Sequence, residues 1–86
     1  MRLRNVPCGE IVPDAPERRY APEDIDALAA DIRANGLLRP ILVSPASSGF
    51  VIVHGERRWR AAIQAGLQSV PAFIVQHHAS REALAA

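Results

Sequence analysis

The sequence predicts one small domain that mixes α-helices and β-strands. Short apolar runs at residues 41–43, 50–53 and 70–75 have the length of strands. Two stretches with helical spacing of apolar residues alternate with them, and glycine or proline separates the elements. With 86 residues, of which 49% are hydrophobic, the chain can build a single compact core.

The first twenty residues predict strands and then a loop. Residues 1–12 read as one or two short strands that Pro7 and Gly9 interrupt. Residues 13–22 are rich in proline and charge and carry the cluster Arg18-Arg19-Tyr20, which is typical of an extended surface loop.

The first helix is expected to begin at Pro22 and to end at Gly36. Proline suits the first helical position, and Glu23 and Asp24 favour the positive end of the helix dipole. The apolar positions repeat at i, i+3, i+4 and i+7, namely Ile25, Leu28, Ala29 and Ile32.

The middle of the chain predicts a β-hairpin followed by a second helix. The turn-rich segment 44–49 joins the two apolar runs of the hairpin. The helix should span Glu56 to Ala65 and stop at Gly66, with Trp59 toward the core and Arg57 and Arg60 facing away.

The last part predicts a strand over Val70–Val75, and Pro71 favours an edge position or a strand start. Ser80 suits the cap of a third helix, Arg81 to Ala86, which is little more than a turn long. We therefore expect the chain to be part of a longer protein.

Charge and composition exclude several classes of protein. All ten basic residues are arginine, yet the formal net charge is only +1, so anion recognition would depend on local clustering. The single cysteine excludes an internal disulfide and favours a cytoplasmic location. No apolar run approaches the roughly 20 residues that span a bilayer, so no membrane partner is expected.

The most informative segment is Gly55-Glu56-Arg57-Arg58-Trp59-Arg60-Ala61. It places three arginines at the start of a helix, where cations are disfavoured unless an anion is bound. A strand that delivers a glycine and then a helix start is also a geometry that holds phosphate. A solvated arginine-rich helix, paired with the acidic first helix, remains an open alternative.

Two segments resemble the conserved boxes of the ParB family of DNA-segregation proteins. Residues 55–62, with Ala65-Gly66 and Val70-Pro71 after them, are similar to the second box, and residues 28–41 are similar to the first. The resemblance implies an α/β domain of the ParB/sulfiredoxin type, a small mixed sheet flanked by helices. It also implies that this domain binds CTP with Mg²⁺.

The resemblance further implies the residues of the site. The arginine box would hold the triphosphate, and the Gly36–Pro40 turn would line the nucleotide pocket, with base contacts made largely by backbone groups. Arg18 and Arg19 resemble an arginine that follows a proline-rich loop in the family, although the family's Pro-Arg pair is here Glu17-Arg18-Arg19, and a solvated loop is the alternative interpretation. The full set is Arg19, Gly36, Leu38, Arg39, Pro40, Gly55, Glu56, Arg57, Arg58 and Arg60.

Glu56 is the candidate catalytic residue, because a carboxylate inside the phosphate box can orient Mg²⁺ or an attacking water. Its simpler interpretation is a first-turn acid that offsets the neighbouring arginines. No protein metal site is predicted: adjacent histidines such as His77 and His78 point to opposite faces of a strand, and Cys8 is remote in sequence.

Three functions remain open. The first is the nucleotide-sensing N-terminal domain of a ParB-like chromosome or plasmid partition protein of bacteria, with slow CTP hydrolysis as a switch. In that family a third nucleotide motif, a helix-turn-helix reader of DNA and a self-association domain follow this segment. We therefore expect residues 1–86 alone to bind nucleotide weakly and to read no DNA sequence.

The second function is a stand-alone enzyme of the same fold, an ATPase, nuclease or small-molecule kinase. The third is a regulator that keeps the fold and docks onto a partner. Sulfiredoxin itself is disfavoured, because its reactive cysteine lies in the phosphate loop, where this chain has Glu56.

Overall fold

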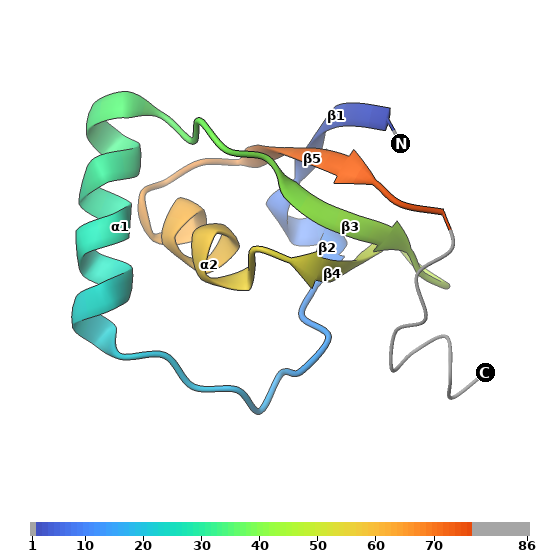
Figure 1. Cartoon of the computed structure of the whole chain (residues 1–86), viewed down its shortest axis with the longest axis horizontal. Helices are drawn as coiled ribbons and strands as arrows, with labels where there is room; N and C mark the ends of the chain where they lie inside the picture. Colours follow the sequence, from blue (N-terminus) through green and yellow to red (C-terminus); the bar gives the residue numbers. More distant parts are fainter. Residues whose placement is uncertain (1, 77–86) are drawn as a thin grey trace.

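The computed structural model describes residues 2–76, which form a five-stranded mixed sheet and two α-helices (Figure 1). The predicted helix at 81–86 and the residues His77 and His78 lie outside this part. In chain order the elements are β1 (Arg2–Pro7), the 3₁₀ helix η1 (Cys8–Glu10), β2 (Ile11–Val12), α1 (Pro22–Asn35), β3 (Ile41–Pro45), β4 (Phe50–His54), α2 (Glu56–Gln64) and β5 (Ser69–Ile74).

The strands follow the order β1-β5-β3-β4-β2. The pairs β1/β5 and β3/β4 are antiparallel, whereas β5/β3 and β4/β2 are parallel. This arrangement confirms the predicted mixed sheet, the β3–β4 hairpin and the interruption of the N-terminal strand near Pro7 and Gly9.

Both helices agree closely with the sequence. Pro22 is the first residue of α1, and Gly36, at φ +78°, caps its end by donating its N–H to the carbonyl of Ile32 at 2.8 Å. The second helix ends at Gln64, one residue before its predicted end, and Gly66 follows at φ +93°. Glycine terminates each helix because it reaches positive φ without strain.

Both helices lie to one side of the sheet, with α2 between α1 and the strands (Figure 1). Small residues allow this packing: Ala29 of α1 and Ala61 and Ala62 of α2 are fully buried. Ile41, Val43 and Ala72 belong to the same core, and Trp59 packs against it with its ring partly buried. The predicted inward orientation of Trp59 is therefore confirmed, and Arg57 is exposed as expected.

Pro71 corrects one expectation. The strand β5 is not an edge strand, because β1 and β3 flank it. Pro71 pairs with Asn5 of β1, but the pairing with β3 begins only at Ala72, opposite Ile41. The missing N–H of Pro71 therefore removes no bond to β3, which is why an interior strand tolerates it.

Among residues 2–76 no helix is long and apolar enough to cross a membrane.

Candidate functional site

Gly55 forms the junction between β4 and α2, where any side chain would be strained and crowded. Its φ is +102°, in the left-handed region, and its carbonyl accepts the N–H of Trp59 at 3.0 Å as the first bond of the helix. A Cβ at this position would lie 2.8 Å from Cγ2 of Ile41. Glycine therefore allows the chain to turn sharply while β3 passes close by.

A cavity of about 650 Å³ opens at this junction. The loop between β2 and α1, the inner face of α1, the end of β4 and the start of α2 all contribute to its wall. The lining residues are Asp14, Ala15, Arg18, Tyr20, Leu28, Asp31, Arg39, Ile52, Val53, His54, Gly55, Glu56, Arg57 and Arg58. Four arginines thus face three carboxylates around one opening.

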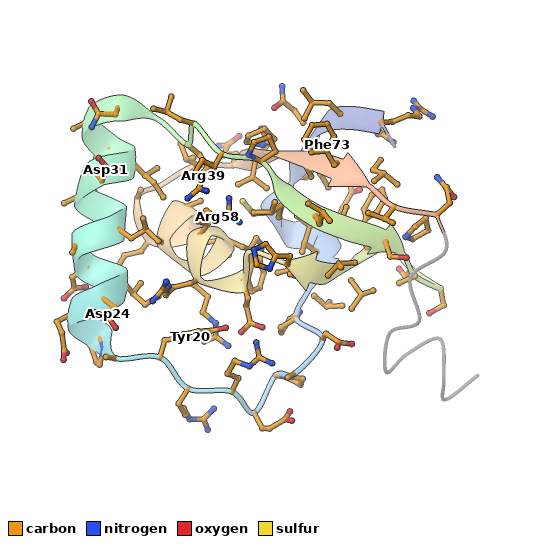
Figure 2. All side chains as sticks on the ribbon, in the orientation of Figure 1. Tyr20, Asp24, Asp31, Arg39, Arg58 and Phe73 are labelled. Carbon is orange, nitrogen blue, oxygen red and sulfur yellow. The ribbon has the colours of Figure 1, made fainter. Side chains whose placement is uncertain are left out.

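Arg39 and Arg58 approach the cavity from different segments, as their labelled side chains in Figure 2 show. Arg58 lies on α2, whereas Arg39 lies between α1 and β3. Partial burial, followed by the positive charge of Arg39, lowers the pKa of Arg58. Two cations held together make this part of the wall a favourable place for an anion.

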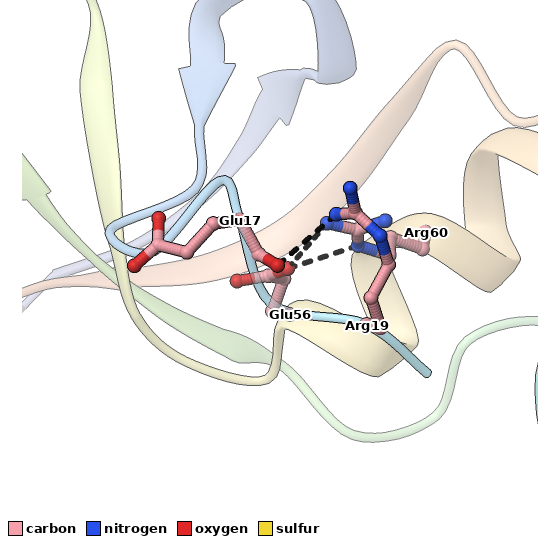
Figure 3. Close-up of polar contacts among 4 residues, drawn as sticks. All are labelled: Glu17, Arg19, Glu56 and Arg60. Atoms are coloured by element: carbon pink, nitrogen blue, oxygen red, sulfur yellow. Dashed lines mark hydrogen bonds and ion pairs between the residues drawn. The ribbon is translucent and has the colours of Figure 1, made fainter. Parts of the chain in front are cut away.

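Glu56 is the buried carboxylate of the cavity, with 6% of its surface exposed. Its Oε2 accepts hydrogen bonds from Nε of Arg60 at 2.9 Å and pairs with Nη2 of Arg60 at 2.8 Å (Figure 3). Glu56 is thus an anionic partner for Arg60 within the same helix. The positive charge of Arg60 near the start of α2 is therefore compensated without a bound ligand.

Arg58 also has partners within the chain. Its Nη1 donates to the carbonyl oxygens of Arg39 at 3.3 Å and of Pro40 at 3.1 Å. Arg57 is the most exposed of the three helix arginines and lines the cavity. The three arginines of the box therefore have three different environments.

The structure does not bring every predicted residue to this cavity. Gly36, Leu38 and Pro40 are absent from its lining, and the side chain of Leu38 is 79% exposed. Arg19 and Arg60 line a second cavity of about 530 Å³, which lies against Trp59, Ile63 and the start of α1. Arg19 donates to the carbonyl of Glu17 at 3.0 Å (Figure 3).

Of the two neighbouring arginines considered for the nucleotide site, Arg18 lines the first cavity, whereas Arg19, the one chosen for the predicted site, lines the second. A hydrogen bond to Tyr20 and charge interactions, first with Tyr20 and then with Glu56 and Asp14, raise the pKa of Arg18. Tyr20 lines both cavities, and its ring lies 5.2 Å from the guanidinium carbon of Arg60. The sequence contains the Arg18-Arg19-Tyr20 cluster but does not indicate which member turns inward, because an irregular loop has no period.

Carboxylates line the cavity without forming a metal site of their own. Within residues 2–76 there is no group of three or more His, Cys, Asp or Glu side chains that could hold a metal ion. Mg²⁺ is commonly bound by one or two protein carboxylates together with the phosphates of a nucleotide. Glu56, one oxygen of which is paired with Arg60, is a carboxylate that could serve in this way.

The fold and the cavity define a small α+β domain with an arginine-rich site at a strand–glycine–helix junction. A family model described as the ParB N-terminal domain matches residues 1–86, and the chain belongs to that family.

Relatives support this assignment. The chain is 51% identical over 72 residues to the chromosome-partitioning protein Spo0J of Thermus thermophilus, covering 84% of this chain and 26% of that protein. It therefore spans about a quarter of the length of this relative.

Solved structures agree. The C-terminally truncated chromosome-partitioning protein ParB of Caulobacter crescentus, complexed with CTP-gamma-S, superimposes with a TM-score of 0.81 at 38% identity, covering 91% of this chain and 46% of that one. The same protein complexed to the centromeric parS site gives 0.78 at 38% identity, with 95% and 44% covered. Sulfiredoxin of Arabidopsis thaliana, 22% identical, shares the fold with a TM-score of 0.79 over 90% of this chain and 88% of its own, which confirms the predicted fold class.

Proposed function

We propose that this domain binds CTP with Mg²⁺ in the 650 Å³ cavity and serves as the nucleotide-sensing part of a DNA-segregation protein. The observation that carries the proposal is the meeting of Arg18, Arg39, Arg57 and Arg58 around Gly55. Guanidinium groups bind phosphate oxygens with charge-assisted bonds, and the N–H groups at the start of α2 add to this attraction. The ParB structure that holds CTP-gamma-S supports the choice of nucleotide.

The phosphates would lie at residues 55–58, and the segment 36–40 would adjoin the base. Arg39 links these two regions, since it belongs to the segment and lines the cavity. Arg60 and Arg19 line the neighbouring cavity and would act on the nucleotide only indirectly, Arg60 through its bond to Glu56.

Mg²⁺, when bound, neutralises phosphate charge and orients the attacking water. In this chain Glu56 is the group that would bind the ion or that water, because it is the buried carboxylate beside the phosphate box. Slow CTP hydrolysis would belong to the longer, cytoplasmic protein. DNA binding, which the Caulobacter relative shows in its complex with the parS site, and self-association would belong to regions outside these 86 residues.

Titration calorimetry with CTP, UTP, ATP and GTP in the presence of Mg²⁺ tests this proposal. We expect CTP to bind most tightly and Arg57→Ala to weaken binding by about tenfold, the loss of one charge-assisted contact. Arg33→Ala is the matched control, since Arg33 is an exposed arginine of α1 that bonds to the carbonyl of Gln64 and does not line the cavity. Equal, purely salt-sensitive binding of all four nucleotides would refute the proposed pocket.

A further inference from the structure

The second cavity, of about 530 Å³, adjoins Arg60, whereas Glu56, the ion-pair partner of Arg60, lines the candidate nucleotide cavity. The loop before α1, the start of α1 and residues of α2 form its wall. Most of this wall is apolar or aromatic, from Pro13, Tyr20, Pro22, Ile25, Trp59 and Ile63. A concave surface of this composition suits an apolar group of a binding partner.

The apolar part of this wall is open to solvent. Ile63 is 47% exposed, although the two residues before it on α2, Ala61 and Ala62, are fully buried. Trp59 lies one helical turn before Ile63 and is only partly buried, so the two side chains are neighbours on the surface of α2. Tryptophan, tyrosine and arginine are enriched among the residues that dominate binding between proteins.

Hydrogen bonds hold the groove in shape. Nε2 of Gln64 on α2 donates to Oδ1 of Asp26 on α1 at 2.7 Å. Arg60 pairs with Glu56 at 2.8 Å, and its guanidinium carbon lies 5.2 Å from the centre of the Tyr20 ring in the loop. The two helices and the loop are thus linked before anything binds, which lowers the entropic cost of binding.

Arg19 is placed to recognise an acidic group at this groove. It is exposed, and its Nη1 donates to an uncharged group, the carbonyl of Glu17, at 3.0 Å (Figure 3). A guanidinium has five N–H donors, and its planar fork matches the two oxygens of a carboxylate. A carboxylate beside the groove would therefore bond to Arg19 while an apolar side chain fills the groove.

We propose that this cavity is a docking site for a short segment of a partner protein, one that carries a large apolar side chain close to an acidic residue. The apolar side chain packs against Trp59 and Ile63, and the acidic residue pairs with Arg19. The inference goes beyond nucleotide binding, because Gly55, Arg57 and Arg58 line the other cavity.

The first arm of the test titrates the nucleotide-free chain with synthetic peptides that place phenylalanine or leucine at different spacings from glutamate. Trp59 is the single tryptophan of the chain and lines the groove, so its fluorescence reports binding. We expect the best peptide to shift this fluorescence and the amide resonances of Ile25 and Ile63. Replacing its apolar residue by alanine should weaken binding by about tenfold. No shift at about 1 mM of any of these peptides would overturn the proposal.

The second arm uses variants of the chain. Ile63→Gln should weaken the best peptide by about tenfold, because a polar side chain replaces part of the apolar wall. Leu3→Gln is the matched control, since Leu3 is 57% exposed on β1 and does not line the groove. Equal weakening by both variants would refute the docking site.

Arg19→Ala should weaken the same peptide by about threefold. In this variant, replacing the glutamate of the peptide by glutamine should have no further effect, because the ion pair is already lost. Additive losses from the two changes would show that Arg19 does not contact the glutamate and would overturn that part of the proposal.

Other occupants give different results. Resonances of Ile25 and Ile63 that shift with the concentration of the chain alone would assign the groove to a second copy and contradict a partner protein. A longer protein that excludes a peptide bound by the 86-residue chain would assign it to its own continuation, with the same consequence. Peptides that bind equally well without the apolar residue would reduce the site to charge attraction. Failure to bind CTP by a chain that binds the peptide would refute the proposed function and leave this inference intact.

Discussion

The Nη2 atom of Arg60 lies 2.8 Å from Oε2 of Glu56, one helical turn earlier on α2. The Glu56 side chain is 5% exposed and that of Arg60 is 33% exposed, so the carboxylate is the desolvated member of the pair. One carboxylate oxygen is thereby oriented and occupied, while the same residue lines the candidate nucleotide cavity. Glu56 thus has a structural partner and a position suited to chemistry, and the two roles can be separated by experiment.

Glu56→Gln separates these two roles. In the 86-residue chain the amide keeps the size of the side chain but loses the ion pair, so we expect the free energy of unfolding to fall by about 1–2 kcal/mol. In a longer protein the same change should preserve most CTP affinity and remove hydrolysis, because the charge that acts on Mg²⁺ or water is lost. Denaturant unfolding and single-turnover cleavage measure the two effects.

The control for Glu56→Gln is Glu23→Gln, which alters the exposed first-turn acid of α1 and should cost only a few tenths of a kcal/mol. Cleavage of CTP by the Glu56→Gln protein at the wild-type rate would show that Glu56 is a structural acid alone.

Gly55→Ala should destabilise the fold strongly. The new Cβ would combine the strain of φ +102° with the 2.8 Å approach to Ile41, so we expect a loss of roughly 2–4 kcal/mol in denaturant unfolding. Gly9→Ala is the matched control, since a Cβ at Gly9 meets no atom within 4 Å and its φ is not positive. A loss below about 0.5 kcal/mol for Gly55→Ala would contradict the described junction.

Trp59 should contribute both packing and a hydrogen bond. Its ring packs against the core while remaining partly exposed, and its Nε1 donates to the carbonyl of Cys8 at 3.4 Å. We expect Trp59→Ala to cost about 3 kcal/mol, the lower end for a large aromatic residue, and Trp59→Phe about 1 kcal/mol. Unfolding followed by circular dichroism avoids dependence on tryptophan fluorescence. Equal losses in the two variants would assign the whole effect to the hydrogen bond.

Cys8 should make stability decrease at alkaline pH. Burial raises the pKa of its thiol, although a backbone hydrogen bond opposes this, and Sγ lies 3.5 Å from the carbonyl of Leu67. Because the folded pKa exceeds the unfolded one, the stabilisation is fully present below the unfolded pKa and is lost as pH rises through the folded pKa.

Unfolding curves at several alkaline pH values, compared with Cys8→Ala, measure this contribution of Cys8. The wild-type chain should lose more stability with rising pH than the variant. Its thiol should also react with an aromatic disulfide more slowly in the folded than in the unfolded chain. Parallel pH dependence of the two proteins would contradict the proposed effect of burial.

The sequence alone determined the elements whose signals are local. Pro22 and Gly36 bound α1, and Gly55 and Gly66 bound α2, because the conformational limits of proline and glycine act within a few residues. The apolar runs likewise identified β3, β4 and β5. The order of residues within the two boxes was sufficient to identify the family, which a match over residues 1–86 confirms.

Only the tertiary structure decided which strands are neighbours and which arginines share a cavity. The position of β5 between β1 and β3 depends on pairing between segments about 30 and 65 residues apart, and local propensity carries no information about such pairing. For the same reason the inward turn of Arg18, the pairing of Arg60 with Glu56 and the bonds from Arg58 to Arg39 and Pro40 could not be read from the sequence. An arginine side chain is long and flexible, so its partner is decided by the groups that folding brings within its reach.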